Sequence, residues 1–68
     1  MKNRIRDERL AKGWSQEYLS EMVGVSRQTI ISLESGKYNA SLVLAHKLAQ
    51  AFDCAIEDLF IFEGDENI

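Results

Sequence analysis

The sequence predicts a single all-α domain of five short helices, and three observations lead to this prediction. Apolar residues recur at spacings of three and four, which is the period of a helix with one buried face. Asparagine or serine precedes four of the expected helices, where a side-chain oxygen can accept a hydrogen bond from the first turn. Glycine follows the first three, where a left-handed residue ends a helix at low cost.

The expected helices can be placed one by one from these signals. In order, they are a helix from a cap at Asn3 to about Lys12, helices at 16–23 and 27–35, a helix from Leu42 to about Phe52, and a helix from Ile56 to Phe60. The run Phe60-Ile61-Phe62 also allows a short C-terminal strand. The expected core consists of the residues on the apolar stripes, with Trp14 lying over it: Leu19, Met22, Val23, Ile30, Leu33, Leu44, Ala45, Leu48, Ala49 and Phe52.

Length and charge limit the possible functions. The 68 residues suffice for one domain, expected to cover 1–68, and the net charge is −3. This charge is unevenly distributed, because residues 1–14 hold five basic and two acidic residues, whereas residues 41–68 hold one basic and six acidic ones. A polyanion would therefore face the first part of the chain, and the acidic tail would point away from it.

Several classes of function find no support in the sequence. There is no apolar run long enough to span a membrane, and the first residues do not resemble a signal peptide, so we expect a cytoplasmic protein without membrane contact. Cys54 is the only cysteine and His46 the only histidine, so we expect no metal, no cofactor and no disulfide. We also expect no enzymatic activity and no small-molecule substrate.

The third helix offers side chains that can read bases. Ile30 and Leu33 define its buried side, and Arg27, Gln28 and Ser32 then fall on the outward side. Arginine suits guanine O6 and N7, and glutamine suits adenine N6 and N7. The second and third helices, about 16–35, are joined by the short glycine-containing turn of a helix-turn-helix motif, whose second helix enters the major groove. The N-termini near Gln16, Arg27 and Leu42 present N–H groups that suit phosphate oxygens.

At this point a family resemblance becomes clear. The stretch "SQEYLSEMVGVSRQTIISLESGKYNASLVLAHKLAQAF" resembles the core of the Xre family, the lambda-repressor-like helix-turn-helix DNA-binding domains. The segment "IEDLF" resembles the ending of the small stand-alone members of that family. The likeness covers roughly residues 3–62. It implies a five-helix lambda-repressor-like domain that binds double-stranded DNA.

The resemblance also implies roles for individual residues. It assigns base reading to Arg27, Gln28 and Ser32, and a structural ion pair to Arg9 and Glu34. Gln16 resembles a phosphate-binding glutamine that also braces the base-reading glutamine. The full set of residues implied in phosphate or backbone contacts is Ser15, Gln16, Ser26, Thr29, Ser35, Lys37, Tyr38 and Asn39.

Three positions depart from the family pattern. Ser20 replaces a frequent alanine where the second helix packs against the third, and serine is small enough to fit. Ala40 replaces a frequent proline before the fourth helix, which allows a looser loop. Ile31 is apolar on the outward side of the third helix. It can either contact a thymine methyl group or cover the rim of the core.

The run Phe60, Ile61 and Phe62 is expected to form a dimer contact within the tail 60–68, since small family members are typically homodimers. The leading interpretation is a sequence-specific regulator, expected to be a repressor that binds an inverted repeat as a homodimer. The alternative is a protein-interaction module, an antitoxin-like or anti-regulator subunit whose main partner is another protein. A non-specific DNA-coating protein is disfavoured, because such proteins are usually strongly basic.

Overall fold

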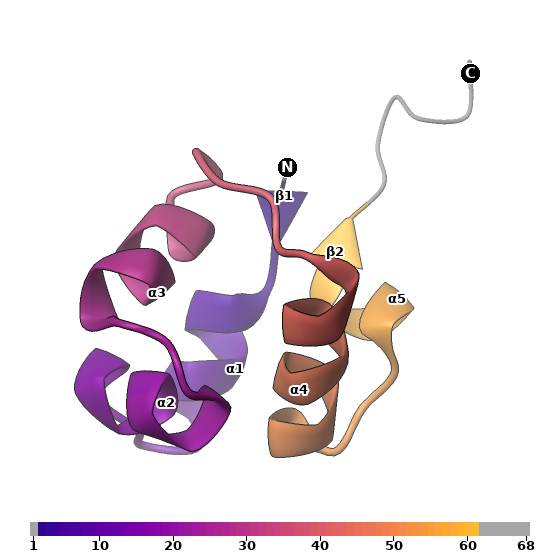
Figure 1. Ribbon diagram of the computed structural model, residues 1–68. Helices are drawn as coiled ribbons and strands as arrows, with labels where there is room; N and C mark the ends of the chain where they lie inside the picture. The colour runs from indigo at the N-terminus through magenta and orange to yellow at the C-terminus, as the bar shows by residue number, and fades with distance from the viewer. Residues whose placement is uncertain (1, 62–68) are drawn as a thin grey trace.

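The computed structural model describes residues 2–61, and helices account for most of them (Figure 1). The elements in chain order are β1 (Lys2–Asn3), α1 (Ile5–Ala11), α2 (Gln16–Val23), α3 (Arg27–Glu34), α4 (Leu42–Phe52), α5 (Ile56–Leu59) and β2 (Phe60–Ile61). The predicted fold of five helices is confirmed. The short strand expected near the C-terminal side is also present, and it pairs with a strand that the sequence did not predict.

The helices pack around one cluster of buried apolar side chains. In Figure 1, α1, α2 and α3 lie on one side and α4 and α5 on the other, and α2 packs against both α3 and α4. All five helices contribute to the core, whose fully buried large side chains are Ile5, Leu19, Ile30, Leu33, Leu48 and Leu59. Each such side chain contributes about 1.5–3 kcal/mol through its removal from water. The cluster therefore fixes the position of α3 relative to the rest of the chain.

The expected serine caps are confirmed at α2, α3 and α4. The hydroxyl oxygen of Ser15 accepts a hydrogen bond from the Tyr18 N–H at 2.9 Å. Ser26 and Ser41 cap their helices in the same way, with N–H to oxygen distances of 3.1 and 3.2 Å. Such a cap stabilises a helix by about 1 kcal/mol. At α1 the side chain of Asn3 accepts from the Ile5 N–H at 3.1 Å, one residue before the N-cap position.

The C-cap residues of α2 and α4 have a left-handed backbone. Gly24, between α2 and α3, has φ +74°, and no atom lies within 4 Å of where a Cβ would be. This turn therefore needs glycine for its backbone angle and not for lack of space. Asp53 ends α4 with φ 55°, although it is not a glycine. Aspartate tolerates this region better than most residues, which explains how α4 ends without a glycine.

The buried face of α2 differs from the prediction at one position. Leu19 and Val23 are buried, but Met22 is 40% exposed and Ser20 is buried in its place. The Ser20 side chain is 4% exposed, and its hydroxyl donates to the Glu17 carbonyl at 2.7 Å. A buried hydroxyl with a hydrogen-bond partner costs little. The long Met22 side chain is left on the outside of the helix.

The end of α5 also differs from the prediction. The helix stops at Leu59, and Phe60 has an extended backbone that places it in β2, opposite Asn3 of β1. The Phe60 side chain is 4% exposed and belongs to the core of its own chain. It was expected at a dimer contact, but a side chain buried in this way is not available to a partner. Ile61 is half-buried, and Phe62 lies outside the described residues.

Candidate nucleic-acid interface

The outward face of α3 carries the three side chains predicted to read bases. Arg27 and Gln28 are exposed, and Ser32 is half-buried. On the opposite side of the helix, Ile30 and Leu33 are fully buried, as predicted. The packing of these two residues against the core therefore turns the polar face of α3 outward. Ile31 is half-buried at the edge of this face.

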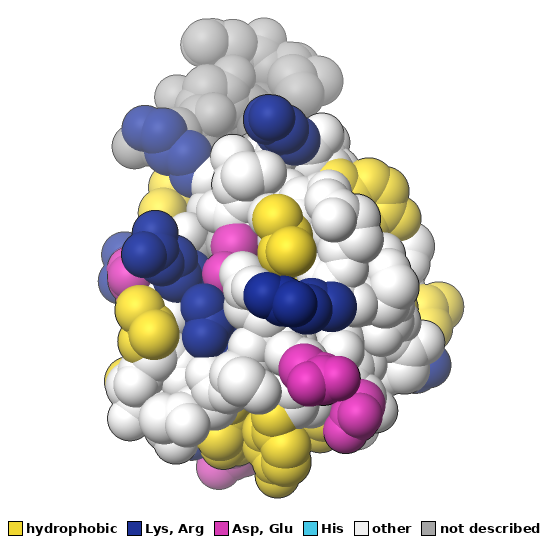
Figure 2. Space-filling model, turned by 90° about the vertical axis from the view of Figure 1, so that its left-hand side faces the viewer, with side chains coloured by type: hydrophobic (Ala, Val, Ile, Leu, Met, Phe, Trp, Pro, Cys, Tyr) yellow, Lys and Arg dark blue, Asp and Glu magenta, His cyan; other side chains and the backbone are white. Residues whose placement is uncertain are grey.

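A depression of about 720 Å³ runs between α1, the start of α2 and α3. Its lining residues are Arg6, Arg9, Ser15, Gln16, Glu17, Arg27, Ile31, Glu34 and Ser35. The fold thus brings together four of the predicted DNA contacts, Ser15, Gln16, Arg27 and Ser35, with the predicted ion pair. On the face that α2 and α3 present, Lys and Arg side chains lie above, to the left of and below a small acidic and apolar centre, and acidic side chains lie at the lower right (Figure 2).

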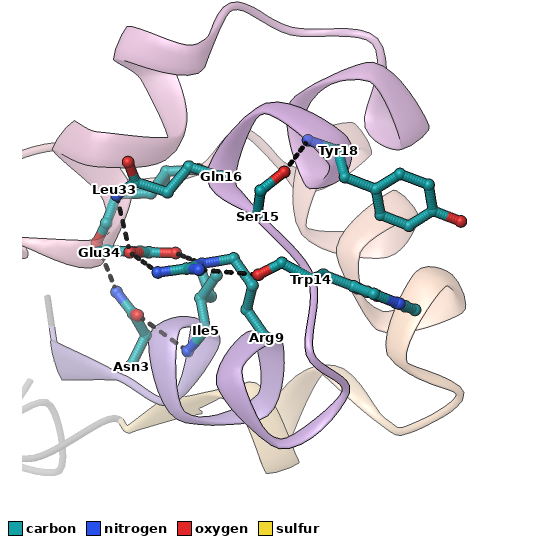
Figure 3. Close-up of polar contacts among 9 residues, drawn as sticks. All are labelled: Asn3, Ile5, Arg9, Trp14, Ser15, Gln16, Tyr18, Leu33 and Glu34. Atoms are coloured by element: carbon teal, nitrogen blue, oxygen red, sulfur yellow. Dashed lines mark hydrogen bonds and ion pairs between the residues drawn. The ribbon is translucent and has the colours of Figure 1, made fainter.

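The floor of this depression contains the ion pair between Arg9 and Glu34 (Figure 3). Arg9 Nε donates to Glu34 Oε2 at 2.7 Å and Arg9 Nη2 donates to Oε1 at 3.2 Å. The two side chains are 9% and 6% exposed. Arg9 Nη1 also donates to the Trp14 carbonyl at 2.9 Å. The pair therefore ties α1 to the C-terminal end of α3 and to the loop before α2.

Gln16 is held by the same carboxylate. Its Nε2 donates to Glu34 Oε1 at 3.2 Å. Within residues 2–61 it makes no hydrogen bond to Gln28, the residue that the resemblance implied it would brace. The amide oxygen of Gln16 has no donor in the described part of the chain, so it remains able to accept a hydrogen bond. Glu34 therefore fixes the orientation of the Gln16 side chain at the start of α2.

The remaining predicted contacts lie around the depression. The hydroxyls of Ser26 and Thr29 are 3.0 Å apart at the start of α3. The Ser35 hydroxyl donates to the Ser32 carbonyl at 2.9 Å. The loop after α3 carries three exposed residues that do not line the depression, Lys37, Tyr38 and Asn39.

The sequence interpretation did not single out Arg6. This residue is exposed on α1 and lines the same depression as Arg27. A signal for its position was available, because residues three apart share one face of a helix and Arg9 had already been placed toward α3. The expected pairing of Arg9 thus indicated the direction of Arg6 as well.

Other kinds of chemistry find little support in the described residues. None of the helices within residues 2–61 has the length and apolarity that a membrane-spanning segment requires. The same residues hold no cluster of His, Cys, Asp and Glu that could bind a metal ion. His46 is exposed, and partial burial together with the nearby Asp58 carboxylate raises the pKa of the Cys54 thiol. A raised pKa keeps a thiol protonated and poorly nucleophilic.

Comparison with known proteins agrees with this geometry. The helix-turn-helix family model matches residues 5–59. An uncharacterised HTH-type transcriptional regulator of Archaeoglobus fulgidus is 54% identical over 66 residues, covering 97% of this chain and 94% of the relative. One from Bacillus subtilis is 48% identical over 67 residues, covering 98% and 100%.

A solved structure gives the same result. The restriction-modification controller protein C.AhdI from Aeromonas hydrophila superposes with a TM-score of 0.77 at 44% identity, covering 84% of this chain and 86% of that one. The fold, the family match and the relatives therefore lead to one assignment. This chain belongs to the Xre-like helix-turn-helix family of DNA-binding transcriptional regulators.

Proposed function

We propose that this regulator is a repressor that binds an inverted-repeat operator as a homodimer, with α3 of each copy in the major groove. The observation that carries the proposal is the outward face of α3, where Arg27 and Gln28 are exposed at the N-terminal end. In helix-turn-helix proteins the first residues of the second helix contact base edges. Both side chains can make bidentate contacts, each worth about 1–3 kcal/mol of discrimination between bases.

Phosphate contacts would supply most of the affinity. The depression places the start of α2 beside Arg27, and the loop 37–39 follows the other end of α3. The N–H groups of Gln16 and Glu17 have no acceptor in the described residues, because the Ser15 hydroxyl takes only the N–H of Tyr18. Open N–H groups at a helix start suit a phosphate oxygen.

The size of the chain supports the proposed dimer, and a dimer would match the inverted-repeat operator proposed above. A domain of 68 residues buries a small share of its surface and gains stability from a partner. Within the described residues, the half-buried Ile61 in β2 is the remaining side chain of the proposed contact. Two copies related by a two-fold axis would place their α3 helices about 34 Å apart. Sedimentation of Ile61→Asp tests this contact, since an unchanged dimer would place the interface elsewhere.

The first experiment is selection of bound sequences from a random duplex pool at moderate salt. Enrichment of an inverted repeat with half-sites about one helical turn apart is the expected result. Binding without enrichment would contradict base reading by α3. A transcription assay with the enriched sequence placed in a promoter then tests repression, and activation there would contradict the proposed direction of control.

Base reading and phosphate binding can be separated by two substitutions. Gln28→Ala should relax base choice with little change in non-specific binding, because Gln28 contacts base edges in this proposal. Lys37→Ala should weaken binding to all sequences alike and lower the salt dependence by about one phosphate contact. Selection profiles and salt titrations of both variants measure this difference. Identical profiles for the two variants would contradict the proposed division of roles.

A protein partner is the second candidate, and one observation favours it. Leu42 and Val43 at the start of α4 are 80% and 65% exposed, so two aliphatic side chains stand together in solvent. Adjacent exposed apolar side chains are typical of contact surfaces. If Val43→Ser abolishes the cellular effect while Arg27→Ala preserves it, the main partner is a protein. The reverse result supports the DNA-binding regulator.

A further inference from the structure

We propose that Arg6 on α1 is a phosphate-binding residue that completes, from outside the helix-turn-helix, the phosphate site at the start of α2. The inference rests on the proposed function, because it concerns the same DNA-binding face. It adds a contact that neither the family resemblance nor the sequence pattern assigned. It also specifies how the basic N-terminal part of an acidic protein reaches DNA.

The five basic residues of the N-terminal segment have different surroundings. The Arg9 guanidinium is already paired with the Glu34 carboxylate. Lys12 places its Nζ 5.5 Å from the centroid of the Trp14 ring, on a different part of the surface. Arg4 lines a separate depression together with three acidic residues, Glu8, Glu57 and Asp58. Lys2 lines a third depression, beside Ser35 and Gly36. Of the two basic α1 residues that line the main depression, Arg9 is paired with Glu34, and Arg6 has no ion-pair partner in the described residues.

The direction of Arg6 follows from helix geometry. Arg6 and Arg9 are three residues apart, so they share one face of α1. The pairing of Arg9 with Glu34 turns this face toward α3. Within residues 2–61, the Arg6 guanidinium has no ion-pair or hydrogen-bond partner, and it is exposed. An unpaired guanidinium at the rim of the depression is free to bind a phosphate.

The groups around Arg6 favour an anion over a base edge. The start of α2 lines the same depression, and the N–H groups of Gln16 and Glu17 are open there. Arg27 also lines this depression, so two guanidinium groups and two N–H donors border one space. Charge-assisted hydrogen bonds from arginine to phosphate are among the strong ones. The Glu17 carboxylate opposes an anion, and Glu34 is neutralised by Arg9.

The chain provides a matched control for this inference. Arg4 and Arg6 are both exposed arginines near the start of α1, but they line different depressions. Arg6→Ala and Arg4→Ala each remove one positive charge, at positions only two residues apart in the sequence. Each phosphate that a basic residue contacts adds about 0.9 to the magnitude of the slope of log Kobs against log salt, because counterions leave that phosphate. A basic residue that contacts no phosphate releases no counterion, so its removal leaves the slope unchanged.

The experiment measures binding of wild type, Arg6→Ala, Arg4→Ala and Arg6→Lys to a labelled random-sequence duplex by fluorescence anisotropy over a range of salt. We expect Arg6→Ala to lower the magnitude of the slope by about 0.9, and Arg4→Ala and Arg6→Lys to keep the wild-type slope. Urea unfolding of the same samples confirms that each variant is folded.

The outcomes separate this inference from the proposed function. Equal slopes for Arg6→Ala and Arg4→Ala, with salt-dependent binding by the wild type, would overturn the role of Arg6 and leave the proposed function standing. A loss of slope in Arg6→Lys would also overturn it, since a phosphate contact survives as a point charge. If the wild-type protein does not bind DNA at low salt, both the proposed function and the role of Arg6 are wrong.

Discussion

The two ends of α3 are built in opposite ways. At the C-terminal end, the Glu34 carboxylate receives hydrogen bonds from Arg9 and Gln16, and the Leu33 carbonyl receives one from the Asn3 side chain at 2.7 Å. At the N-terminal end, Arg27 and Gln28 are exposed and have no partner side chain within residues 2–61. One end of the helix is fixed by three other elements of the fold, and the other is left open.

This difference assigns the two ends of α3 different tasks: the C-terminal end holds the helix in place, and the N-terminal end carries side chains that can contact DNA. A side chain without a partner inside the protein can contact DNA at a lower cost in free energy, because no internal hydrogen bond has to be broken first. The helix itself still has to be held rigidly, because a displaced backbone would misplace both Arg27 and Gln28. Substitutions at the C-terminal end should therefore change stability, and substitutions at the N-terminal end should change recognition.

The largest effect is expected from Arg9→Ala. It leaves the Glu34 carboxylate nearly buried without its cation, and breaking a buried pair in this way costs about 3–5 kcal/mol. Urea unfolding followed by circular dichroism measures the loss, with the exposed Arg4→Ala as the control. A loss below about 1 kcal/mol would mean that the pair behaves as a surface ion pair and does not hold α3.

A smaller loss is expected from Asn3→Ala. It removes the donor to the Leu33 carbonyl and the acceptor for the Ile5 N–H, and a typical hydrogen bond contributes about 0.5–1.5 kcal/mol. Asn3→Asp is the matched variant, because it keeps the acceptor and loses the donor. In urea unfolding, the wild type should have a larger free energy of unfolding than Asn3→Ala and Asn3→Asp. If Asn3→Asp is as stable as wild type, the bond to Leu33 does not hold the end of α3.

The smallest effect on stability is expected from Arg27→Ala. The side chain is exposed and without a partner in the described residues, so the free energy of unfolding should change by less than about 0.5 kcal/mol. Binding to a selected operator should nevertheless weaken, and the preference at one base position should relax. A variant that is strongly destabilised would show that the N-terminal end of α3 is also structural, and the contrast between the two ends would disappear.

Local signals explain why the five helices could be predicted. Ser15, Ser26 and Ser41 act through the turn that follows each of them, and the stripe from Leu44 to Phe52 repeats with the helical period. The pairing of Arg9 with Glu34 came from the family resemblance, because no local rule links residues 25 positions apart. Face assignments that depended on one helix alone, such as those of Ile30 and Leu33, were confirmed.

The remaining features depend on contacts between distant parts of the chain. Phe60 was placed in a helix, but its strand depends on Asn3, which lies at the opposite end of the described residues. Met22 was assigned to the core, but the fold buries the small Ser20 and leaves Met22 40% exposed. The position of Arg6 in the depression likewise depends on how α1 is rotated against α3. Periodicity cannot specify such rotations, because it defines a face but not the neighbour that covers it.

The burial of the Arg9–Glu34 pair has a consequence for handling and for regulation. At 0.1 M salt, dissolved ions largely screen the interaction between exposed charges more than about 10 Å apart, but they screen buried pairs much less. Concentrated salt should therefore release this protein from DNA, while α3 keeps its position in the fold. Release and rebinding then need no refolding, so we expect binding to DNA to follow the ionic conditions rapidly and reversibly.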